Sequence, residues 1–130
     1  VREPKVAIVA DIGTLQRLPR IIGVGPAREL IYTGRDIDGA AAQKIGLVNQ
    51  TFESRTAVIE GAWAVANEIA ENAPLAVQGS KRVMIEANRG EIDRELEYVA
   101  TWNAAHLVTQ DLGTAVEAFA MKKKPTFSGR

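Results

Sequence analysis

The apolar segment at residues 5–10 is the strongest strand candidate in a sequence whose other apolar residues mostly recur at helical spacing. Its valine and isoleucine content is typical of a buried strand or an extended segment. A strand needs partners, and residues 47–52 are the other extended stretch that the pattern indicates. We therefore expect a mainly α chain with short β segments, and we expect the sequence to be part of something longer.

The first helix signals follow this segment. Asp11 is a plausible N-cap for a helix through Leu15 and Ile22, since aspartate is a preferred N-cap residue. Pro19 lies inside that pattern and should kink or end the helix. A second helix should end at Gly34, because glycine favours the position after a helix C-terminus.

Later helices are marked by their caps and breakers. Asp36 or Asp38 can cap a short helix that ends near Gly46. A break at residues 72–74 separates two long helices, and Gly90 should end the second of them. The predicted long helices cover residues 55–71, 74–90, 92–109 and 111–124.

Composition and charge exclude several classes of protein. The chain has 130 residues, with 16 basic and 16 acidic side chains, no cysteine and one histidine, His106. The balanced charge argues against a nucleic-acid partner, and no apolar run is long enough for a membrane span. Without cysteine there is no disulfide scaffold or thiolate site, and one histidine excludes a multi-histidine metal centre. Carboxylates are therefore the expected chemical agents.

Two carboxylates flank the apolar segment, Glu3 before it and Asp11 after it. A carboxyl group in apolar surroundings can take up or release a proton near neutral pH, and a pair in different environments can pass a proton along. Two structural readings compete: Asp11 as a helix cap and Glu3 as a solvated charge. Eight fully extended residues span up to about 26 Å, so joint action requires the segment to bend.

The sequence resembles a known family at these positions. Glu3-Pro4, followed by Asp11 and the run to Gly23, is similar to the second half of a crotonase-superfamily enzyme, the enoyl-CoA hydratase/isomerase family. The Gln-Arg-Leu-Pro block at residues 16–19 and the Gly-Leu-Val block at residues 46–48 carry the most specific part of the match. Further matching residues are Leu30, Thr33-Gly34-Arg35, Ile37, residues 40–42, 72–74, Ala118-Phe119 and 122–127.

This resemblance implies a fold and an assembly. The chain would form the C-terminal part of a crotonase-like α/β spiral of the ClpP/crotonase type. Residues 1–52 would be the end of the core and carry the active-site segment, and residues 53–130 would be a helical oligomerisation region. Family members assemble through their last helices, so a homo-oligomer, a trimer or hexamer, is expected.

The resemblance also assigns roles to the two carboxylates. Glu3 falls where the family places its second catalytic carboxylate. Most hydratases have glycine at the position of Asp11, and an acid there is similar to the Δ3,5-Δ2,4-dienoyl-CoA isomerases, in which this pair shuttles a proton along the acyl chain. The expected function is thus isomerisation of a 3,5-dienoyl-CoA to the 2,4-dienoyl form. The alternatives are an enoyl-CoA hydratase, which adds water to a 2-enoyl-CoA, and a non-catalytic helical assembly fragment.

The remaining implications concern the substrate. Phe119 and Lys122 are expected to contact the nucleotide of CoA, which arrives as part of an acyl-CoA thioester, and no metal or redox cofactor is implied. The family's oxyanion hole and first catalytic acid lie upstream of this sequence, so the chain alone is expected to be inactive. A cytoplasmic location is the default expectation, because no targeting segment is recognisable.

Overall fold

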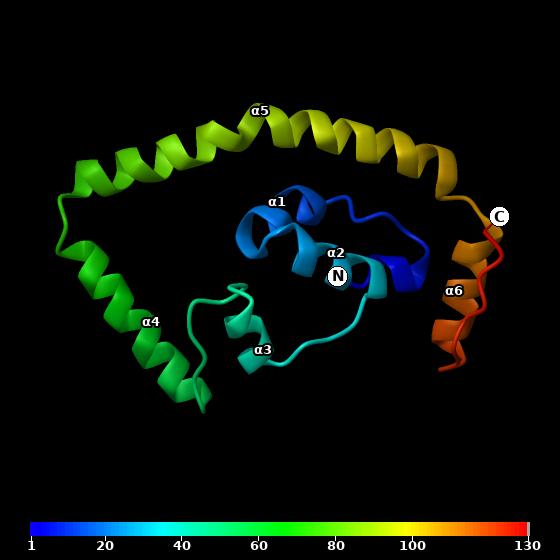
Figure 1. Cartoon of the computed structure of the whole chain (residues 1–130), viewed down its shortest axis with the longest axis horizontal. Coiled ribbons are helices and arrows are strands. Elements are labelled where there is room, and N and C mark those ends of the chain that lie inside the picture. Colours follow the sequence, from blue (N-terminus) through cyan, green and yellow to red (C-terminus); the bar gives the residue numbers. More distant parts are fainter. Residues whose placement is uncertain (130) are drawn as a thin grey trace. The chain divides into compact units, whose positions relative to one another are not determined.

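The computed structural model describes residues 1–129, apart from the side chain of residue 88. The described chain folds as two compact units, residues 1–37 with residues 92 onward, and residues 38–91. The elements in chain order are η1 (Glu3–Val6), α1 (Thr14–Ile22), α2 (Val24–Thr33), α3 (Gly39–Lys44), α4 (Arg55–Ala70), α5 (Pro74–His106) and α6 (Gln110–Ala120), as Figure 1 shows. The expected division at residue 52 concerns function and stays a prediction.

The expected short β segments are not confirmed, since no strand forms within residues 1–129. Residues 3–6 form a 3₁₀ helix instead, with Pro4 in the first turn, where its missing N–H is no loss. Residues 8–11 have no regular secondary structure, and residues 47–52 are bends and irregular backbone. An extended segment becomes a strand only when a second strand pairs with its backbone, and the described chain offers none.

The expectation that Asp11 caps α1 is wrong. The N-cap is Gly13, whose φ of 89° lies in the left-handed region, and no side chain bonds the end of the helix. A Cβ at Gly13 would collide with the guanidinium group of Arg17, which folds back and donates to the carbonyl oxygen of Ile12 at 2.9 Å. The helix continues past Pro19 and ends at Ile22.

The expected end of α2 and cap of α3 are confirmed. Gly34 follows α2 with a φ of 56°, and its N–H donates to the carbonyl oxygen of Leu30. Of the two cap candidates before α3, Asp38 is the one used, because its carboxylate accepts the N–H of Ala41 at 2.8 Å.

The long helices agree with the sequence except at Gly90. Helix α4 matches its expected range, with Ser54 as its cap. Helix α5 is one helix of 33 residues where two were expected, so the break predicted at Gly90 is wrong. A glycine inside a helix costs only about 1 kcal/mol relative to alanine and, unlike proline, keeps its N–H in the hydrogen-bond ladder. Thr109 caps α6.

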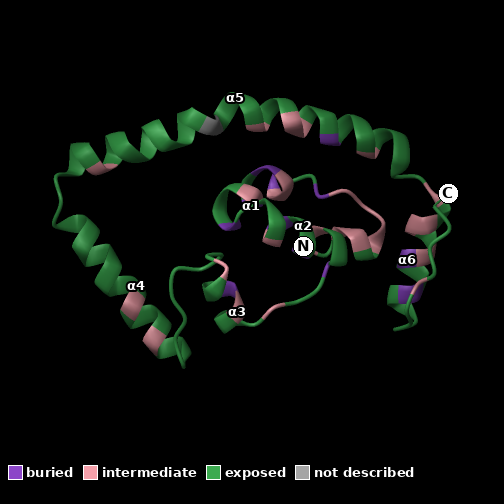
Figure 2. Cartoon of the chain, viewed as in Figure 1, coloured by how far each residue is buried: buried purple, intermediate pink, exposed green. Residues whose placement is uncertain are grey.

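The first unit contains nearly all of the described core. Helices α1 and α2 pack on each other, and η1 packs on both α2 and α6. Small residues allow the close approaches, because alanine side chains hold helices only a short distance apart. The buried apolar residues of this unit are Ala10, Leu18, Ile22, Ala27, Leu30, Val99, Ala115 and Ala118 (Figure 2).

The second unit has almost no core of its own. Ala42 is its one buried residue among those described, and α4 buries none (Figure 2). Large apolar side chains lie in the open instead, among them Trp63, which is 66% exposed, and Leu75, which is 84% exposed.

The residues after α6 run back beside that helix (Figure 1). The carboxylate of Asp111, in the first turn of α6, accepts the N–H of Ser128 at 2.7 Å, the N–H of Gly129 at 2.8 Å and the hydroxyl of Ser128 at 3.1 Å. The backbone N–H of Ser128 is the main reason why the pKa of Asp111 lies below its ordinary value of 3.8, although desolvation opposes this shift.

The tail should therefore detach in acid. Because the pKa of Asp111 is depressed in the folded state, docking stabilises the chain above pH 3.8 and is lost as the pH falls through the lowered pKa. The amide proton shifts of Ser128 and Gly129, followed by NMR, should titrate with a midpoint below 3.8. Asp111→Asn should abolish that titration, and a midpoint at or above 3.8 would contradict the docking.

Candidate active site

Glu3 is the first residue of η1 and is half-buried. Its Oε2 atom is fully buried and has no hydrogen-bond partner in the described chain. A buried carboxylate oxygen without a partner costs roughly 1–3 kcal/mol, so such an atom in a native fold needs an explanation, of which a catalytic role is one. The structure thus gives Glu3 an environment unlike that of the solvated charge expected for an exposed glutamate.

The segment between Glu3 and Asp11 is bent. Ala7 takes a left-handed conformation with a φ of 57°, and the N–H of Ile8 donates back to the carbonyl oxygen of Glu3 at 3.1 Å. Residues 3–8 therefore add little length, and the three residues from 8 to 11 reach at most about 10 Å. The bend that joint action requires is present in the fold.

Asp11 lies at the end of the same segment and is exposed. Since Gly13 and Arg17 form the start of α1, the carboxylate of Asp11 is not used as a cap. It makes no hydrogen bond or ion pair within residues 1–129. Asp11 is therefore available for proton transfer, while its neighbour Ala10 is 2% exposed and anchors the backbone.

A shallow hollow of about 220 Å³ lies at the start of α1, and its lining begins with Ile12, the residue after Asp11. Its lining is mostly apolar, and Arg17 is the one charged residue in it. Such a surface suits an aliphatic chain rather than a charged group. The lining residues are Ile12, Gly13, Thr14, Arg17, Leu18 and Ile21.

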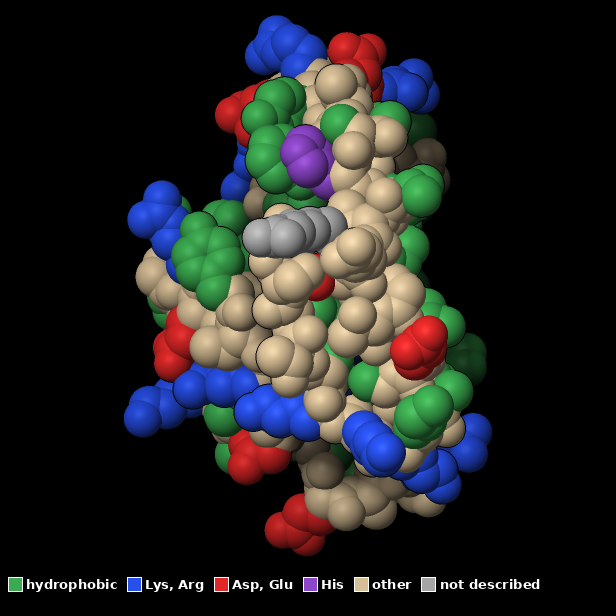
Figure 3. Space-filling model, turned by 90° about the vertical axis from the view of Figure 1, so that its right-hand side faces the viewer, with side chains coloured by type: hydrophobic (Ala, Val, Ile, Leu, Met, Phe, Trp, Pro, Cys, Tyr) green, Lys and Arg blue, Asp and Glu red, His purple; other side chains and the backbone are tan. Residues whose placement is uncertain are grey.

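A second pocket, of about 450 Å³, lies between η1, α6 and the tail. It joins the aromatic ring of Phe119 to three cationic side chains, Arg2, Lys5 and Lys123, and no carboxylate lines it. Phe119 is 81% exposed, so its ring is open to a ligand. Lys and Arg side chains also gather in the lower half of the face in Figure 3. Cations beside an aromatic ring suit a ligand with phosphate groups and a flat base.

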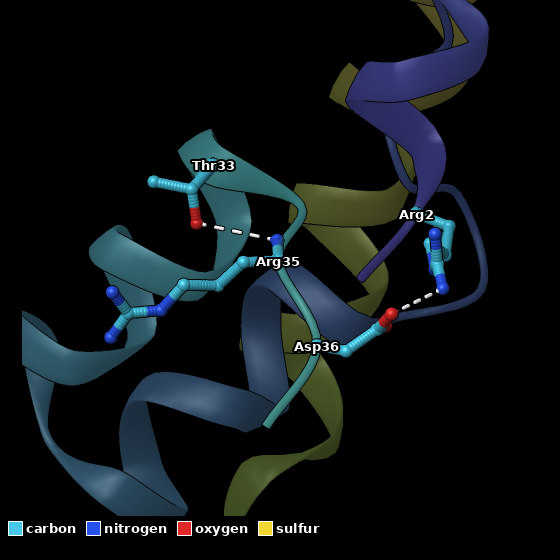
Figure 4. A network of polar contacts seen from close by, with 4 residues as sticks. All are labelled: Arg2, Thr33, Arg35 and Asp36. Carbon is cyan, nitrogen blue, oxygen red and sulfur yellow. Dashed lines mark hydrogen bonds and ion pairs between the residues drawn. The ribbon is translucent and has the colours of Figure 1, made fainter. Parts of the chain in front are cut away.

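Local geometry explains why two of these cations meet. Arg2 and Lys5 are three residues apart at the start of a 3₁₀ helix, in which residues i and i+3 lie on the same side. The stem of Lys5 crosses Gly34, where a Cβ would meet Lys5 carbons at 3.2 Å. Arg2 also pairs with Asp36 at 2.6 Å beside the end of α2 (Figure 4), and both side chains remain mostly exposed.

Lys122 is not among the residues that line this pocket. It follows α6 with a left-handed φ of 52°, and its N–H donates to the carbonyl oxygen of Phe119. Sequence reasoning missed Arg2, Lys5 and Lys123. The i, i+3 spacing of Arg2 and Lys5 is a signal only once residues 3–6 are known to be a 3₁₀ helix rather than a strand.

His106 contacts Trp102, four residues earlier on the same helix. Its ring stacks on Trp102 with 4.3 Å between the ring centroids, and its Nδ1 lies 2.9 Å from the carbonyl oxygen of Trp102. Within residues 1–129 no three His, Asp or Glu side chains are grouped to hold a metal ion. No helix of the described residues is long and apolar enough to cross a membrane.

Two similar proteins of known sequence are both named as dienoyl-CoA isomerases. The chain is 44% identical over 128 residues to the peroxisomal Delta(3,5)-Delta(2,4)-dienoyl-CoA isomerase of Arabidopsis thaliana, which covers 98% of this chain and 46% of that protein. It is 41% identical over 127 residues to the mitochondrial isomerase of the same name from Dictyostelium discoideum, covering 98% and 43%. The chain thus spans less than half the length of these relatives.

Solved structures agree. A carnitinyl-CoA dehydratase from Mycobacterium avium 104 matches with a TM-score of 0.88 and 30% identity, over 99% of this chain and 51% of that one. An enoyl-CoA hydratase/isomerase from Pseudoalteromonas atlantica T6c matches with a TM-score of 0.85 and 27% identity, over 97% and 50%. The family model for enoyl-CoA hydratase/isomerase matches residues 1–130. With this match over its whole length, the chain belongs to the enoyl-CoA hydratase/isomerase family.

Proposed function

We propose that this chain supplies the proton-transfer segment of a dienoyl-CoA isomerase, which converts a 3,5-dienoyl-CoA to the 2,4-dienoyl-CoA. The observation that carries the proposal is Asp11, which is exposed and free of any capping role at the end of the bent segment that begins with Glu3. The relatives named as dienoyl-CoA isomerases support the choice of reaction.

In this mechanism the carboxylate of Glu3 takes a proton from C2, beside the thioester carbonyl. The electrons pass into a conjugated dienolate, and protonated Asp11 donates its proton to C6. The double bonds then lie at positions 2 and 4, and a proton returns from Glu3 to Asp11 through solvent. These transfers use no metal or redox cofactor, and CoA enters as part of the substrate.

The two carboxylates have environments that suit these roles. Glu3 is only half-buried: its Oε2 atom is buried without a partner, while the rest of the side chain is partly open to a substrate. Asp11 is exposed, so it can exchange its proton with water between turnovers. The apolar hollow whose lining begins at Ile12, the residue after Asp11, suits the distal part of an acyl chain, which supports the assignment of Asp11 to C6.

Asp11→Asn, made in the complete product of the gene that encodes this sequence, should lower the rate of 3,5-to-2,4 isomerisation by about 10²–10⁴-fold, the usual contribution of a general acid or base. Glu3→Gln should lower this rate at least as much, because removal of the proton from C2 is the first step. Dienoyl-CoA formation is followed by its ultraviolet absorbance. Because Asp11 makes no hydrogen bond in the described chain, the melting temperature of the Asn variant should barely change.

Asp38→Asn is the matched control, since Asp38 is a true helix cap and asparagine also caps well. It should leave isomerisation unchanged. An Asp11→Asn protein that keeps nearly full isomerase activity would contradict the proposal. Hydration of a 2-enoyl-CoA, which relies on Glu3 without Asp11, would then be the better assignment.

We also propose that the pocket beside Phe119 receives the nucleotide end of CoA. The Phe119 ring can stack on adenine, and the cations Arg2, Lys5 and Lys123 can hold phosphate groups. Lys122, which the family resemblance favours, is a neighbouring alternative.

Lys123→Gln and Phe119→Leu should each raise KM for the acyl-CoA about fivefold, because a partly exposed contact contributes on the order of 1 kcal/mol. Lys122→Gln is the paired variant. A larger effect at Lys122 would assign the phosphate contact to that residue instead. With an acyl-pantetheine substrate, which has no nucleotide, the KM differences should disappear, and their persistence would contradict the proposed pocket.

A homo-oligomer, a trimer or hexamer, is proposed from the exposed apolar side chains of the second unit. Trp63→Glu should shift the sedimentation coefficient at micromolar concentration towards smaller species, because it places a charge in an apolar surface. Gln78→Glu adds the same charge at an exposed polar position and should leave the assembly intact. A monomeric wild-type protein would contradict this proposal.

The compartment is a separate matter. The relatives are named peroxisomal and mitochondrial, and neither compartment is the cytoplasm expected from the sequence. A cytoplasmic location stays a prediction, which cell fractionation would test.

A further inference from the structure

A side chain of α5 holds the backbone between the two carboxylates. The Nδ2 group of Asn103 donates to the carbonyl oxygen of Val9 at 2.9 Å, and the N–H of Val9 donates to Oδ1 of Asn103 at 3.4 Å. The two residues are 94 positions apart in the sequence. Both bonds are partly buried, so water competes less well for them.

The amide of Asn103 makes the two hydrogen bonds that a neighbouring strand would otherwise make to Val9. In an antiparallel pair, a residue exchanges both its N–H and its C=O bonds with the residue opposite. The primary amide of Asn103 carries a carbonyl oxygen and, on the same edge, an N–H that is cis to it, so it can bond the N–H and the C=O of one residue together. Only asparagine or glutamine provides both groups on one side chain, and an apolar residue of similar size would provide neither.

The residues around this contact are buried, whereas Asp11 is exposed. Val99, one turn before Asn103 on the same helix, is 5% exposed, so this side of α5 faces the core. Ala10, next to Val9, is 2% exposed. Val9 is thus fixed through its backbone and Ala10 through its burial, and Asp11 is the first exposed residue after residues 6–10.

We propose that Asn103 is a positioning residue, which holds this segment so that Asp11 keeps a fixed place relative to Glu3. Its role in catalysis rests on the proposed isomerase function. Glu3 depends on Asn103 less than Asp11 does, because the N–H of Ile8 already ties the carbonyl oxygen of Glu3. Loss of Asn103 should therefore affect proton delivery at C6 more than proton removal at C2.

The test uses Asn103→Leu and Asn103→Asp in the complete gene product. Leucine keeps the volume without the amide, and aspartate can accept from Val9 N–H but cannot donate to its carbonyl as a carboxylate. Thr101→Val is the matched control, because the Thr101 hydroxyl bonds only within its own helix, to the carbonyl oxygen of Glu97. Three quantities are measured: isomerisation kinetics, exchange of the C2 proton with deuterated water, and amide hydrogen exchange of residues 8–11.

In Asn103→Leu, kcat for isomerisation should fall about 10–100-fold, the usual cost of a small misplacement of a catalytic group. KM should stay within about twofold, since no group that contacts substrate is changed. Exchange at C2 should fall much less than isomerisation. Amide exchange at Val9 should become about tenfold faster. Asn103→Asp should lie between leucine and wild type, and Thr101→Val should match wild type.

Several results would overturn the proposal. Unchanged amide exchange at Val9 would show that Asn103 does not hold the segment. Faster amide exchange with unchanged isomerisation would show that the hold has no catalytic role. An equal loss of C2 exchange and isomerisation, together with a lower melting temperature, would indicate general destabilisation instead of positioning.

Failure of the proposed function is distinguishable from these results. A wild-type protein that does not isomerise a 3,5-dienoyl-CoA would overturn the isomerase assignment and the catalytic role of Asn103 with it. The amide exchange of Val9 would still decide whether Asn103 fixes the backbone, because that measurement needs no turnover.

Discussion

The backbone at Val9 needs hydrogen-bond partners, and in this chain a side chain provides them. The amide of Asn103 takes the N–H and the C=O of Val9 at once, so that a side chain of α5 ties down the segment between Glu3 and Asp11. Ala10 is buried beside Val9, and Asp11 emerges immediately after Ala10. A loop held only by its ends would leave Asp11 without a defined place.

The Glu3 end of the segment is fixed by its local backbone conformation. Residues 3–6 coil into a 3₁₀ helix that ends in a left-handed residue, and the bend returns the chain towards Glu3. The same coil places Arg2 and Lys5 on one side, against Gly34, where a residue without a side chain leaves room for the lysine stem. One local conformation thus supports both the carboxylate site and the cationic pocket.

Local patterns were sufficient to predict most helices. The cap candidate Asp38 predicted α3, because it acts on a backbone group only three residues away, and helical spacing of apolar residues predicted α4. The same local reasoning failed at Gly90, where continued helical bonding outweighs a small propensity cost. It also failed at Asp11, because the Arg17 side chain and the left-handed Gly13 form the start of α1 instead.

The sequence by itself determined the family and the identity of the two carboxylates, because a motif depends only on residue types and their spacing. Only the tertiary structure decided what surrounds them. How far Glu3 is buried and which lysine lies with Phe119 depend on contacts between distant segments, whereas Asp11 is displaced as a cap by Gly13 and Arg17 close by in the sequence. The valines and isoleucines of residues 5–10 favour extension, but a strand requires a partner, and the described fold provides the side chain of Asn103, 94 residues away from Val9.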